Sequence, residues 1–328
     1  MTDKIGILGV GSFLPDKVLS NFDLELMVDT SDEWIKERTG ISFRRIAEKN
    51  IATSDMAYEA SKEALKMANL KPDEIDLIIG ATVTPDMLFP SSACLVQQKL
   101  KAKNAACFDL SAGCTGFIYA LVCAYEFIKS GMYNNALIFG SETLSRIVDW
   151  EDRNTCVLFG DGAGACVIGR VNEGGIIYKL LGADGTKSEL LYIPAGGSKE
   201  PATIDTVRDR KHYIKMNGKE VFRFAVSIIE EMVKRITKES GCPVEEVDYF
   251  LPHQANMRII DSAFRKLNIP MDKVIVNLDK YGNMSAASIP VALDEVVKSG
   301  KVKKNDKIML LGFGAGLTWG GVLIEWCI

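Results

Sequence analysis

The chain has 328 residues, of which 47% are hydrophobic and 25% are charged, and its formal net charge at pH 7 is −4. These proportions predict a globular protein with a substantial core, organised as one large domain or two ordinary ones. The negative charge argues against nonspecific nucleic-acid binding, and no apolar run approaches the length of a membrane span.

The first hundred residues predict an alternation of short strands and amphipathic helices. A strand over Lys4–Val10 leads into two closely spaced glycines, but the third glycine of a dinucleotide fingerprint is missing. The same glycines interrupt the apolar segment, so no signal peptide is expected. The next predicted elements are a helix capped by Asn21 and running to Met27, a helix capped by Ser31, a helix over Ile51–Asn69, a strand over Ile75–Ile79 and a helix from Ser91.

The stretch from Asn104 to Gly131 is the most informative part of the chain. Residues 105–110 read as a short buried strand, and residues 115–129 are apolar around the whole circumference, which predicts a buried helix. Cys114 lies between them, where free backbone N–H groups and the helix dipole favour a thiolate. We interpret Cys114 as a candidate nucleophile. The alternative is a small buried hydrophobic residue, as most cysteines of cytosolic domains are.

The other cysteines and the histidines narrow the chemistry. None of the eight cysteines has CxxC spacing, and most lie within apolar segments. This argues against a zinc site and a disulfide framework, and it predicts a reduced cytosolic protein. Only two histidines are present, His212 and His253, so a mechanism with two catalytic histidines would need both.

The middle of the chain contains glycine-rich and basic segments. Residues 136–139 predict a strand, and residues 141–143 predict a turn. The glycines of Phe159–Gly164 lack the Lys-Ser/Thr ending of a phosphate loop, so we expect them to allow close backbone packing before a strand over Ala165–Gly169. The basic segment Val207–Arg223 fits a solvated face and a site for an acidic partner equally well.

The second half of the chain repeats the first at an offset of about 170 residues. Pro72–Leu77 is echoed by Pro243–Asp248, and each follows a long amphipathic helix, Ile51–Asn69 and Glu220–Ser240. Duplicated α/β halves place their loops at equivalent strand ends, which predicts two halves, 1–172 and 173–328, with a site between them. Cys114, the loop 252–256 and the loop 281–285 would then converge.

Several motifs carry a resemblance to a known family. They are residues 109–116 (DLSAGCTG), 252–256 (PHQAN) and 281–283 (YGN), with further matches at residues 34, 37–41, 159–164 and 312–320. In this order, and over nearly the whole chain, they resemble β-ketoacyl-acyl carrier protein synthase III, the condensing enzyme that starts type II fatty-acid synthesis. One departure is Ala315, where many members carry glycine. Because only its backbone N–H matters, we expect little effect.

The resemblance implies a layered α-β-α-β-α thiolase-like fold and a two-step reaction. Cys114 would take the acyl group from an acyl-coenzyme A, with acetyl as the expected primer. Malonyl-acyl carrier protein would then lose carbon dioxide, and its carbanion would attack the acyl-cysteine to give 3-oxoacyl-acyl carrier protein. His253 and Asn283 would stabilise the enolate, and the backbone N–H groups of Cys114 and Ala315 would form the oxyanion hole.

The resemblance also implies binding residues and partners. The coenzyme A site would comprise Thr30, Trp34, Arg38, Arg153, Gly218, Phe222 and Asn256, with adenine between Trp34 and Arg153. The acidic carrier protein would dock on Arg223, Arg258 and Arg265. The acyl pocket would involve Phe89, Leu144, Leu158 and Phe313, with Phe89 reaching across a homodimer interface. The resemblance implies no bound metal, no permanent cofactor, and no binding to nucleic acid or a membrane. It also implies a cytoplasmic enzyme.

Other interpretations remain open from the sequence. Trp34 also fits a helix anchor, and Arg38 and Arg153 fit surface ion pairs. A polyketide starter synthase or a quinolone-type condensing enzyme would carry the same Cys-His-Asn set. The order Cys…His…Asn also occurs in papain-like proteases, but no CGSCW segment is present, and the duplication has no place there. A non-catalytic binding protein of the same fold would not need the intact triad.

Overall fold

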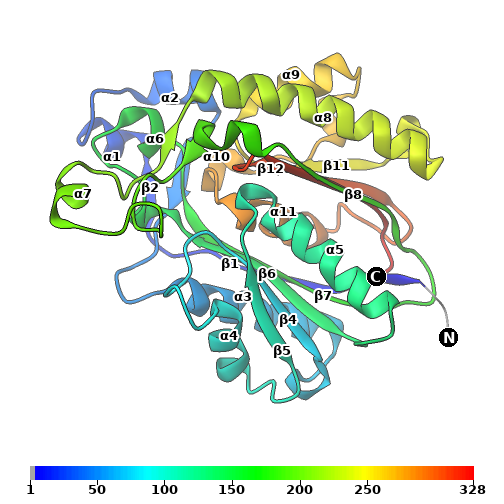
Figure 1. Ribbon diagram of the computed structural model, residues 1–328. Helices are drawn as coiled ribbons and strands as arrows, with labels where there is room; N and C mark the ends of the chain where they lie inside the picture. The colour runs from blue at the N-terminus through cyan, green and yellow to red at the C-terminus, as the bar shows by residue number, and fades with distance from the viewer. Residues whose placement is uncertain (1–3) are drawn as a thin grey trace.

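The computed structural model describes residues 4–328 and shows two β-sheets separated and flanked by helices. Figure 1 shows the layers from bottom to top: outer helices α3 and α4, the first sheet, the inner helices α5 and α11, the second sheet, and the outer helices α8 and α9. This is the α-β-α-β-α arrangement expected for the fold. Its inner helices bury apolar surface on both sides, so they are apolar over most of their circumference.

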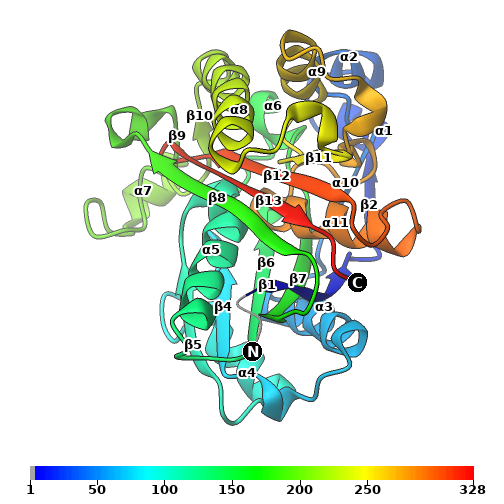
Figure 2. The ribbon, with the colours of Figure 1, turned by 90° about the vertical axis from the view of Figure 1, so that its right-hand side faces the viewer.

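The first sheet has the strand order β1-β7-β6-β4-β5, and the second has the order β8-β13-β12-β11 (Figure 2). The strands of the first sheet are β1 (Ile5–Phe13), β4 (Leu77–Ala81), β5 (Ala106–Leu110), β6 (Ala136–Thr143) and β7 (Asp161–Arg170). The strands of the second sheet are β8 (Gly175–Ala183), β11 (Tyr249–Pro252), β12 (Lys307–Gly314) and β13 (Thr318–Glu325).

The two sheets have matching topologies. In each, a first strand pairs antiparallel with a hairpin, and the hairpin's inner strand then pairs parallel with the next strand: β6 with β4, and β12 with β11. Among residues 4–328, the second sheet has no full strand equivalent to β5. A single parallel bridge from Phe250 to Val274 lies at the corresponding edge. The fold is therefore a structural duplication, as the repeated motifs predict.

Two helices separate the sheets, and each follows a short 3-10 turn. The turn Gly113–Thr115 leads into α5 (Gly116–Lys129), and the turn Ser285–Ala287 leads into α11 (Ser288–Lys298). Glycines on the strands allow close approach: a Cβ atom at Gly164 on β7 would lie 2.7 Å from the Pro290 Cβ of α11. Of the three glycines in Phe159–Gly164, Gly160 precedes β7, whereas Gly162 and Gly164 lie within it.

Four long helices cover the outer faces. They are α3 (Thr53–Ala68) and α4 (Ser92–Leu100) on the first sheet, and α8 (Gly218–Ser240) and α9 (Met257–Lys266) beside the second. The two glycines of β1 that resembled part of a dinucleotide fingerprint have a packing role. A Cβ atom at Gly9 or Gly11 would lie 2.3 Å from a backbone oxygen of α3. They let the helix contact the strand directly.

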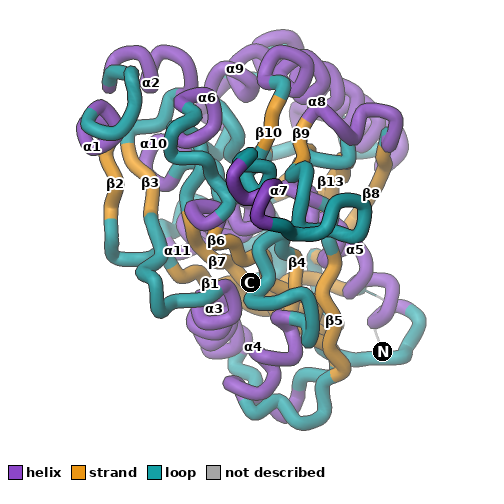
Figure 3. The backbone as a smooth tube through the Cα atoms, turned by 60° about the vertical axis from the view of Figure 1, so that its left-hand side comes forward, coloured by secondary structure: helices purple, strands orange, loops and turns teal. Residues whose placement is uncertain are grey.

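Figure 3 also labels the shorter elements of the chain. They are β2 (Val18–Ser20), α1 (Asn21–Glu25), α2 (Asp32–Thr39), β3 (Phe43–Arg45), α6 (Arg153–Cys156), β9 (Leu191–Tyr192), α7 (Ile204–Arg208), β10 (Lys215–Met216) and α10 (Leu278–Tyr281). The remaining 3-10 turns are Pro72–Glu74, Leu144–Arg146, Gly185–Leu190, Val244–Glu246 and Met271–Lys273.

Two local predictions differ from the structure. Ser20, not Asn21, caps α1, because Asn21 is buried and its amide bonds Asp32 and the backbone of Ile41 instead. Ser141–Thr143 is not a turn but the buried end of β6. Polar residue types favour turns locally, but pairing with β7 keeps this segment extended. Within residues 4–328, no helix has the length and apolarity needed to cross a membrane.

Candidate active site

Cys114 lies in the turn between β5 and α5, at the level of the inner helices. Gly113 before it has a φ of +54°, a left-handed conformation that glycine adopts without steric cost. The facing end of β12 leaves room for the cysteine, because a Cβ atom at Gly314 would lie 2.8 Å from the Cys114 Cβ. The residue is 8% exposed, so it is accessible only through the cavities beside it.

The protonation of Cys114 differs from the expectation. Burial raises the pKa of the thiol to about 12, and the nearby Ser285 side chain offsets part of this rise because it can stabilise the thiolate. Nearby Glu142 raises the pKa further. The N-terminal position of α5 therefore does not produce a resting thiolate, because the cost of desolvating the charge is larger. The thiol must lose its proton during the reaction.

His253 follows β11 and is 1% exposed. Its backbone N–H donates to the Leu311 carbonyl (2.8 Å), and its ring meets the Phe313 ring edge to face at 5.3 Å. Within residues 4–328, neither ring nitrogen has a hydrogen-bond partner. Burial lowers the pKa of His253 to about 3, so the imidazole is neutral at pH 7 and has one N–H to donate into the cavity.

Gln254 fixes the loop that carries His253. Its side-chain N–H groups donate to the carbonyls of Pro252 (2.8 Å) and Ile275 (3.1 Å), and its oxygen accepts from the backbone N–H of Asn277 (2.9 Å). Gln254 is fully buried. It belongs to the PHQAN motif, and it holds β11 against the following segment.

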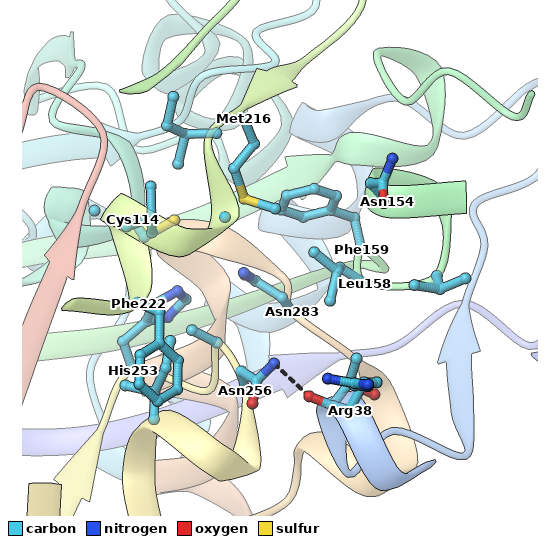
Figure 4. Close-up of a pocket in the computed structure, with 18 of the residues that line it drawn as sticks. Arg38, Cys114, Asn154, Leu158, Phe159, Met216, Phe222, His253, Asn256 and Asn283 are labelled. Atoms are coloured by element: carbon cyan, nitrogen blue, oxygen red, sulfur yellow. Dashed lines mark hydrogen bonds between the residues drawn. The ribbon is translucent and has the colours of Figure 1, made fainter. Parts of the chain in front are cut away.

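Asn283 is oriented by the turn that follows it. Its side-chain oxygen accepts a hydrogen bond from the backbone N–H of Ser285 (2.8 Å). The backbone N–H of Asn283 donates to the Leu158 carbonyl (2.8 Å), which ties the loop to the first half. Because the oxygen is engaged, the amide nitrogen is the end that faces the cavity, between Cys114 and His253 (Figure 4). A thiol, an imidazole and an amide donor thus converge, as the duplication predicts.

These three side chains line one cavity of about 430 Å³, drawn in Figure 4. Six of the seven residues predicted to bind coenzyme A also line it: Trp34, Arg38, Arg153, Gly218, Phe222 and Asn256. The seventh, Thr30, lines neither this cavity nor the second one described below. Residues that the sequence did not single out also line it, among them Asn154, Leu191 and Met216. Nothing in the sequence around these residues indicates that they line a binding site.

At the rim of this cavity, the Arg153 guanidinium stacks on the Trp34 ring at 4.9 Å. Arg153 also donates to the Asp29 carbonyl (2.6 Å). A planar ring between the two would need two contacts of about 3.5 Å each. Adenine therefore fits between them only after the Arg153 side chain moves outward. Asn256 bonds the Arg38 carbonyl (3.0 Å), so it connects the loop after His253 with α2 (Figure 4).

A second cavity of about 240 Å³ opens on the other side of Cys114. Its walls are almost entirely apolar: Val83, Leu144, Ile147, Leu191, Tyr192, Ile193 and Ile214, with Gly113, Ser285 and Ala315 next to the cysteine. Of the four residues predicted for an acyl pocket, only Leu144 lines it. Leu158 and Phe313 line the larger cavity instead, and Phe89 lines neither and is 84% exposed.

The predicted docking arginines lie on two helices. Arg223 is on α8, and Arg258 and Arg265 are on α9. Arg223 pairs with Glu220 and Arg265 with Asp261, each within its own helix, and the guanidinium of Arg258 lies 6.0 Å from the Phe222 ring. Within residues 4–328, no cluster of His, Cys, Asp or Glu residues suits a metal ion.

Comparisons with known proteins agree with this geometry. A profile described as 3-oxoacyl-[acyl-carrier-protein (ACP)] synthase III matches residues 108–185, and its C-terminal counterpart matches residues 237–326. The β-ketoacyl-[acyl-carrier-protein] synthase III of Caldanaerobacter subterraneus subsp. tengcongensis is 58% identical over 99% of both chains.

Two solved structures are similar over nearly their whole length. The 3-oxoacyl-[acyl-carrier-protein] synthase III of Aquifex aeolicus VF5 is 52% identical with a TM-score of 0.92, covering 98% of this chain and 100% of that one. The priming β-ketosynthase of the R1128 polyketide pathway is 36% identical with a TM-score of 0.91, covering 99% of this chain and 96% of that one.

Proposed function

The chain belongs to the β-ketoacyl-acyl carrier protein synthase III family, and from that premise we propose that it starts fatty-acid synthesis. The reaction is the decarboxylative condensation of an acyl-coenzyme A with malonyl-acyl carrier protein. It gives 3-oxoacyl-acyl carrier protein, coenzyme A and carbon dioxide. The observation that carries the proposal is the convergence of Cys114, His253 and Asn283 in one cavity. The identity of 58% and 52% to the two synthases described above, against 36% to the polyketide enzyme, favours fatty-acid synthesis.

In the first step, the sulfur of Cys114 attacks the carbonyl carbon of the acyl-coenzyme A. Charge develops on the carbonyl oxygen, and the backbone N–H groups of Cys114 and Ala315 stabilise it. Ala315 lies close to the turn, because a Cβ atom at Gly113 would approach its backbone nitrogen to 3.1 Å. This placement supports the proposed oxyanion hole.

In the second step, malonyl-acyl carrier protein loses carbon dioxide and becomes an enolate. The Asn283 amide nitrogen and the neutral His253 ring donate hydrogen bonds to the thioester oxygen as its negative charge develops. Neither donor titrates near pH 7, since burial lowers the pKa of His253 to about 3. The two donors therefore remain available over the whole neutral range.

The first half of the chain (1–172) supplies the nucleophile, and the second (173–328) supplies the two donors. The coenzyme A enters along Trp34, Arg38, Arg153, Gly218, Phe222 and Asn256, and Arg153 moves off Trp34 to admit adenine. Thr30 stays a proposed contact at the outer rim. Coenzyme A is a substrate, and no permanent cofactor takes part.

The partner that delivers the malonyl group is an acidic carrier protein, which we place on the exposed face of α8 and α9. Arg223, Arg258 and Arg265 are the groups of this face that would attract an acidic partner to a chain whose net charge is −4. A basic patch attracts an acidic partner despite the overall charge, because ionic screening makes the field local. The enzyme acts in the cytoplasm, where this carrier protein is available.

The assembly we propose is a homodimer formed along β5. This strand is the edge of the first sheet, and unlike β4 and β6 it is not buried. Unpaired sheet edges are sites for pairing with a second copy. The nearby loop exposes Met87, Leu88 and Phe89, with Leu88 88% exposed. Phe89 then reaches the partner's apolar cavity.

The proposal is tested by intact-mass spectrometry after incubation with an equimolar mixture of acetyl-, isobutyryl- and hexanoyl-coenzyme A. We expect a single acyl adduct, which is absent from the Cys114→Ser variant. The adduct mass identifies the primer, because the three acyl groups differ in mass. We expect acetyl, and the cavity of about 240 Å³ sets the limit on acyl size. An adduct that survives in the variant, or no adduct on the wild type, would refute the proposed function.

A further inference from the structure

A buried carboxylate that the two proposed steps do not use lies beside the nucleophile. Glu142, near the end of β6, is 0% exposed. Its oxygens accept hydrogen bonds from Thr84 Oγ1 (2.6 Å), Thr82 Oγ1 (3.2 Å) and the backbone N–H of Val83 (3.1 Å). These three partners are uncharged. A buried carboxylate held only by neutral donors is costly in its ionised form.

Ser285 connects this carboxylate to the nucleophile. Its side chain lies near both groups and lowers the pKa of Glu142 and the pKa of Cys114. Val83, whose backbone N–H donates to Glu142, lines the same apolar cavity as Ser285 and Cys114. A hydroxyl has one proton to donate and two lone pairs to accept with. It can therefore donate to the Glu142 carboxylate while it accepts from the Cys114 thiol.

The backbone of Ser285 adds an independent observation. Its φ is +47°, in the left-handed region, which a residue with a side chain rarely adopts. The equivalent turn in the first half has Gly113 at this position, with a φ of +54°. A residue with a side chain in such a conformation marks a functional site when the surroundings enforce it. The serine hydroxyl is what this position gains over glycine.

The charges of Cys114 and Glu142 determine which way a proton would move between them. A Cys114 thiolate beside an ionised Glu142 would place two negative charges in one low-dielectric space. A proton that passes from the sulfur to the carboxylate leaves the total charge unchanged. We propose that Ser285 and Glu142 form a relay that accepts the thiol proton of Cys114 during acyl transfer and returns it to the coenzyme A that leaves.

The step balances without any added reagent. The Cys114 sulfur bonds to the thioester carbonyl carbon while its proton passes to Ser285 and the Ser285 proton passes to Glu142. The bond from that carbon to the coenzyme A sulfur then breaks, and the protons return along the same path. Coenzyme A leaves as a thiol, and Glu142 is again a carboxylate. Ser285 touches the reacting sulfur, and Glu142 is a positioning residue that acts through it.

The neighbouring ionisable groups do not replace Glu142. On β7 the residue opposite Glu142 is a glycine. Asp161 on β7 and Asp109 on β5 accept hydrogen bonds from backbone N–H groups elsewhere. His253, in the same region as Cys114, does not titrate near neutrality, because burial lowers its pKa to about 3. Burial raises the pKa of Glu142 to about 7, so the relay operates in its carboxylate form above that pH.

The inference rests on the proposed function, and its test measures the two steps separately across pH. Acylation of Cys114 by the primer is followed by quenched single-turnover mass spectrometry, and condensation is started from pre-acylated enzyme with malonyl-acyl carrier protein. Wild-type acylation should rise with pH through about 7. In Glu142→Gln, acylation should fall roughly 10²–10⁴-fold and lose this rise. Condensation from the pre-acylated variant should keep its rate.

Two further variants separate the relay from a structural role. Ser285→Gly suits the left-handed backbone, so it should remain folded and show the same acylation defect. Thr84→Val removes one hydrogen bond to the carboxylate, so it should move the rise in acylation to higher pH. Equal slowing of both steps in Glu142→Gln, or an unchanged pH profile, would overturn the relay. An unreactive wild type would instead refute the proposed function.

Discussion

The turns that begin α5 and α11 share a backbone but not a chemistry. In both, a left-handed residue is the first residue of a single 3-10 turn, and a buried inner helix follows. The first has Gly113 and Cys114 where the second has Ser285 and Ala286. The left-handed φ angles of Gly113 and Ser285 therefore place Ala286 in the position equivalent to Cys114. The two turns thus have the same backbone conformation and differ in two side chains. Gly113 and Cys114 place the nucleophile in the first turn, and Ser285 and Ala286 place a hydroxyl near it in the second.

The largest effect is expected when the first turn loses its reactive atom. Cys114→Ala makes this position identical to Ala286, so no acyl group can be transferred and condensation should be abolished. Decarboxylation of malonyl-acyl carrier protein should persist, because Asn283 and His253 are unchanged. Intact-mass spectrometry measures the first outcome and carbon dioxide release the second. Loss of both activities in a folded variant would contradict the division of labour between the halves.

A second test removes the donor held by the second turn. In Asn283→Asp the side-chain oxygen still accepts from the Ser285 N–H, so the loop should remain in place. The donor becomes a carboxylate that repels the enolate, and condensation should fall roughly 10²–10³-fold. Acylation of Cys114, measured separately, should continue. A comparable loss in acylation would show that Asn283 also acts in the first step.

A third test uses the pH dependence of stability. The pKa of Glu142 is raised from 4.5 to about 7 in the folded chain, so the folded state binds the proton more tightly than the unfolded state. Its contribution to stability is present below pH 4.5 and is lost as pH rises through 7. Relative to Glu142→Gln, the wild type should lose roughly 3 kcal/mol over this range. Urea unfolding at several pH values measures the difference, and parallel curves would contradict the raised pKa.

The smallest effect comes from exchanging the left-handed residues. Gly113→Ser should destabilise the protein by about 1–2 kcal/mol, because a side chain is costly at a φ of +54°. Its Cβ would also lie 3.0 Å from the Ala315 Cβ. Ser285→Gly should not destabilise the fold, since it relieves the same cost. Urea unfolding of both variants checks this asymmetry, and equal losses would show that the two turns are not equivalent.

Local patterns in the sequence located most of the long helices, the core of strands β1, β4, β6 and β7, and the three loops that bring Cys114, His253 and Asn283 to one cavity, but they missed β8 and predicted that β5 is buried. Local patterns gave wrong predictions where contacts between distant segments determine the conformation or the pKa of a residue. Glu142 belongs to a segment that reads as a turn, and only the burial of β6 makes it a perturbed acid. Likewise, the position of Cys114 at a helix start favours a thiolate, but burial dominates its pKa. Desolvation depends on residues distant in sequence, so no local pattern reports it.

The shared inner helices also affect how the chain is made on the ribosome. α5 contacts both sheets, and its core partners Leu310, Val322 and Ile324 belong to the last strands to be synthesised. At roughly 5–20 residues per second, the apolar face of α5 waits many seconds for these partners to emerge. During that time the apolar face of α5 in the nascent first half is exposed to solvent and prone to aggregation. Expression of residues 1–172 alone should therefore yield aggregates, and co-expression with residues 173–328 should be needed to keep it in solution.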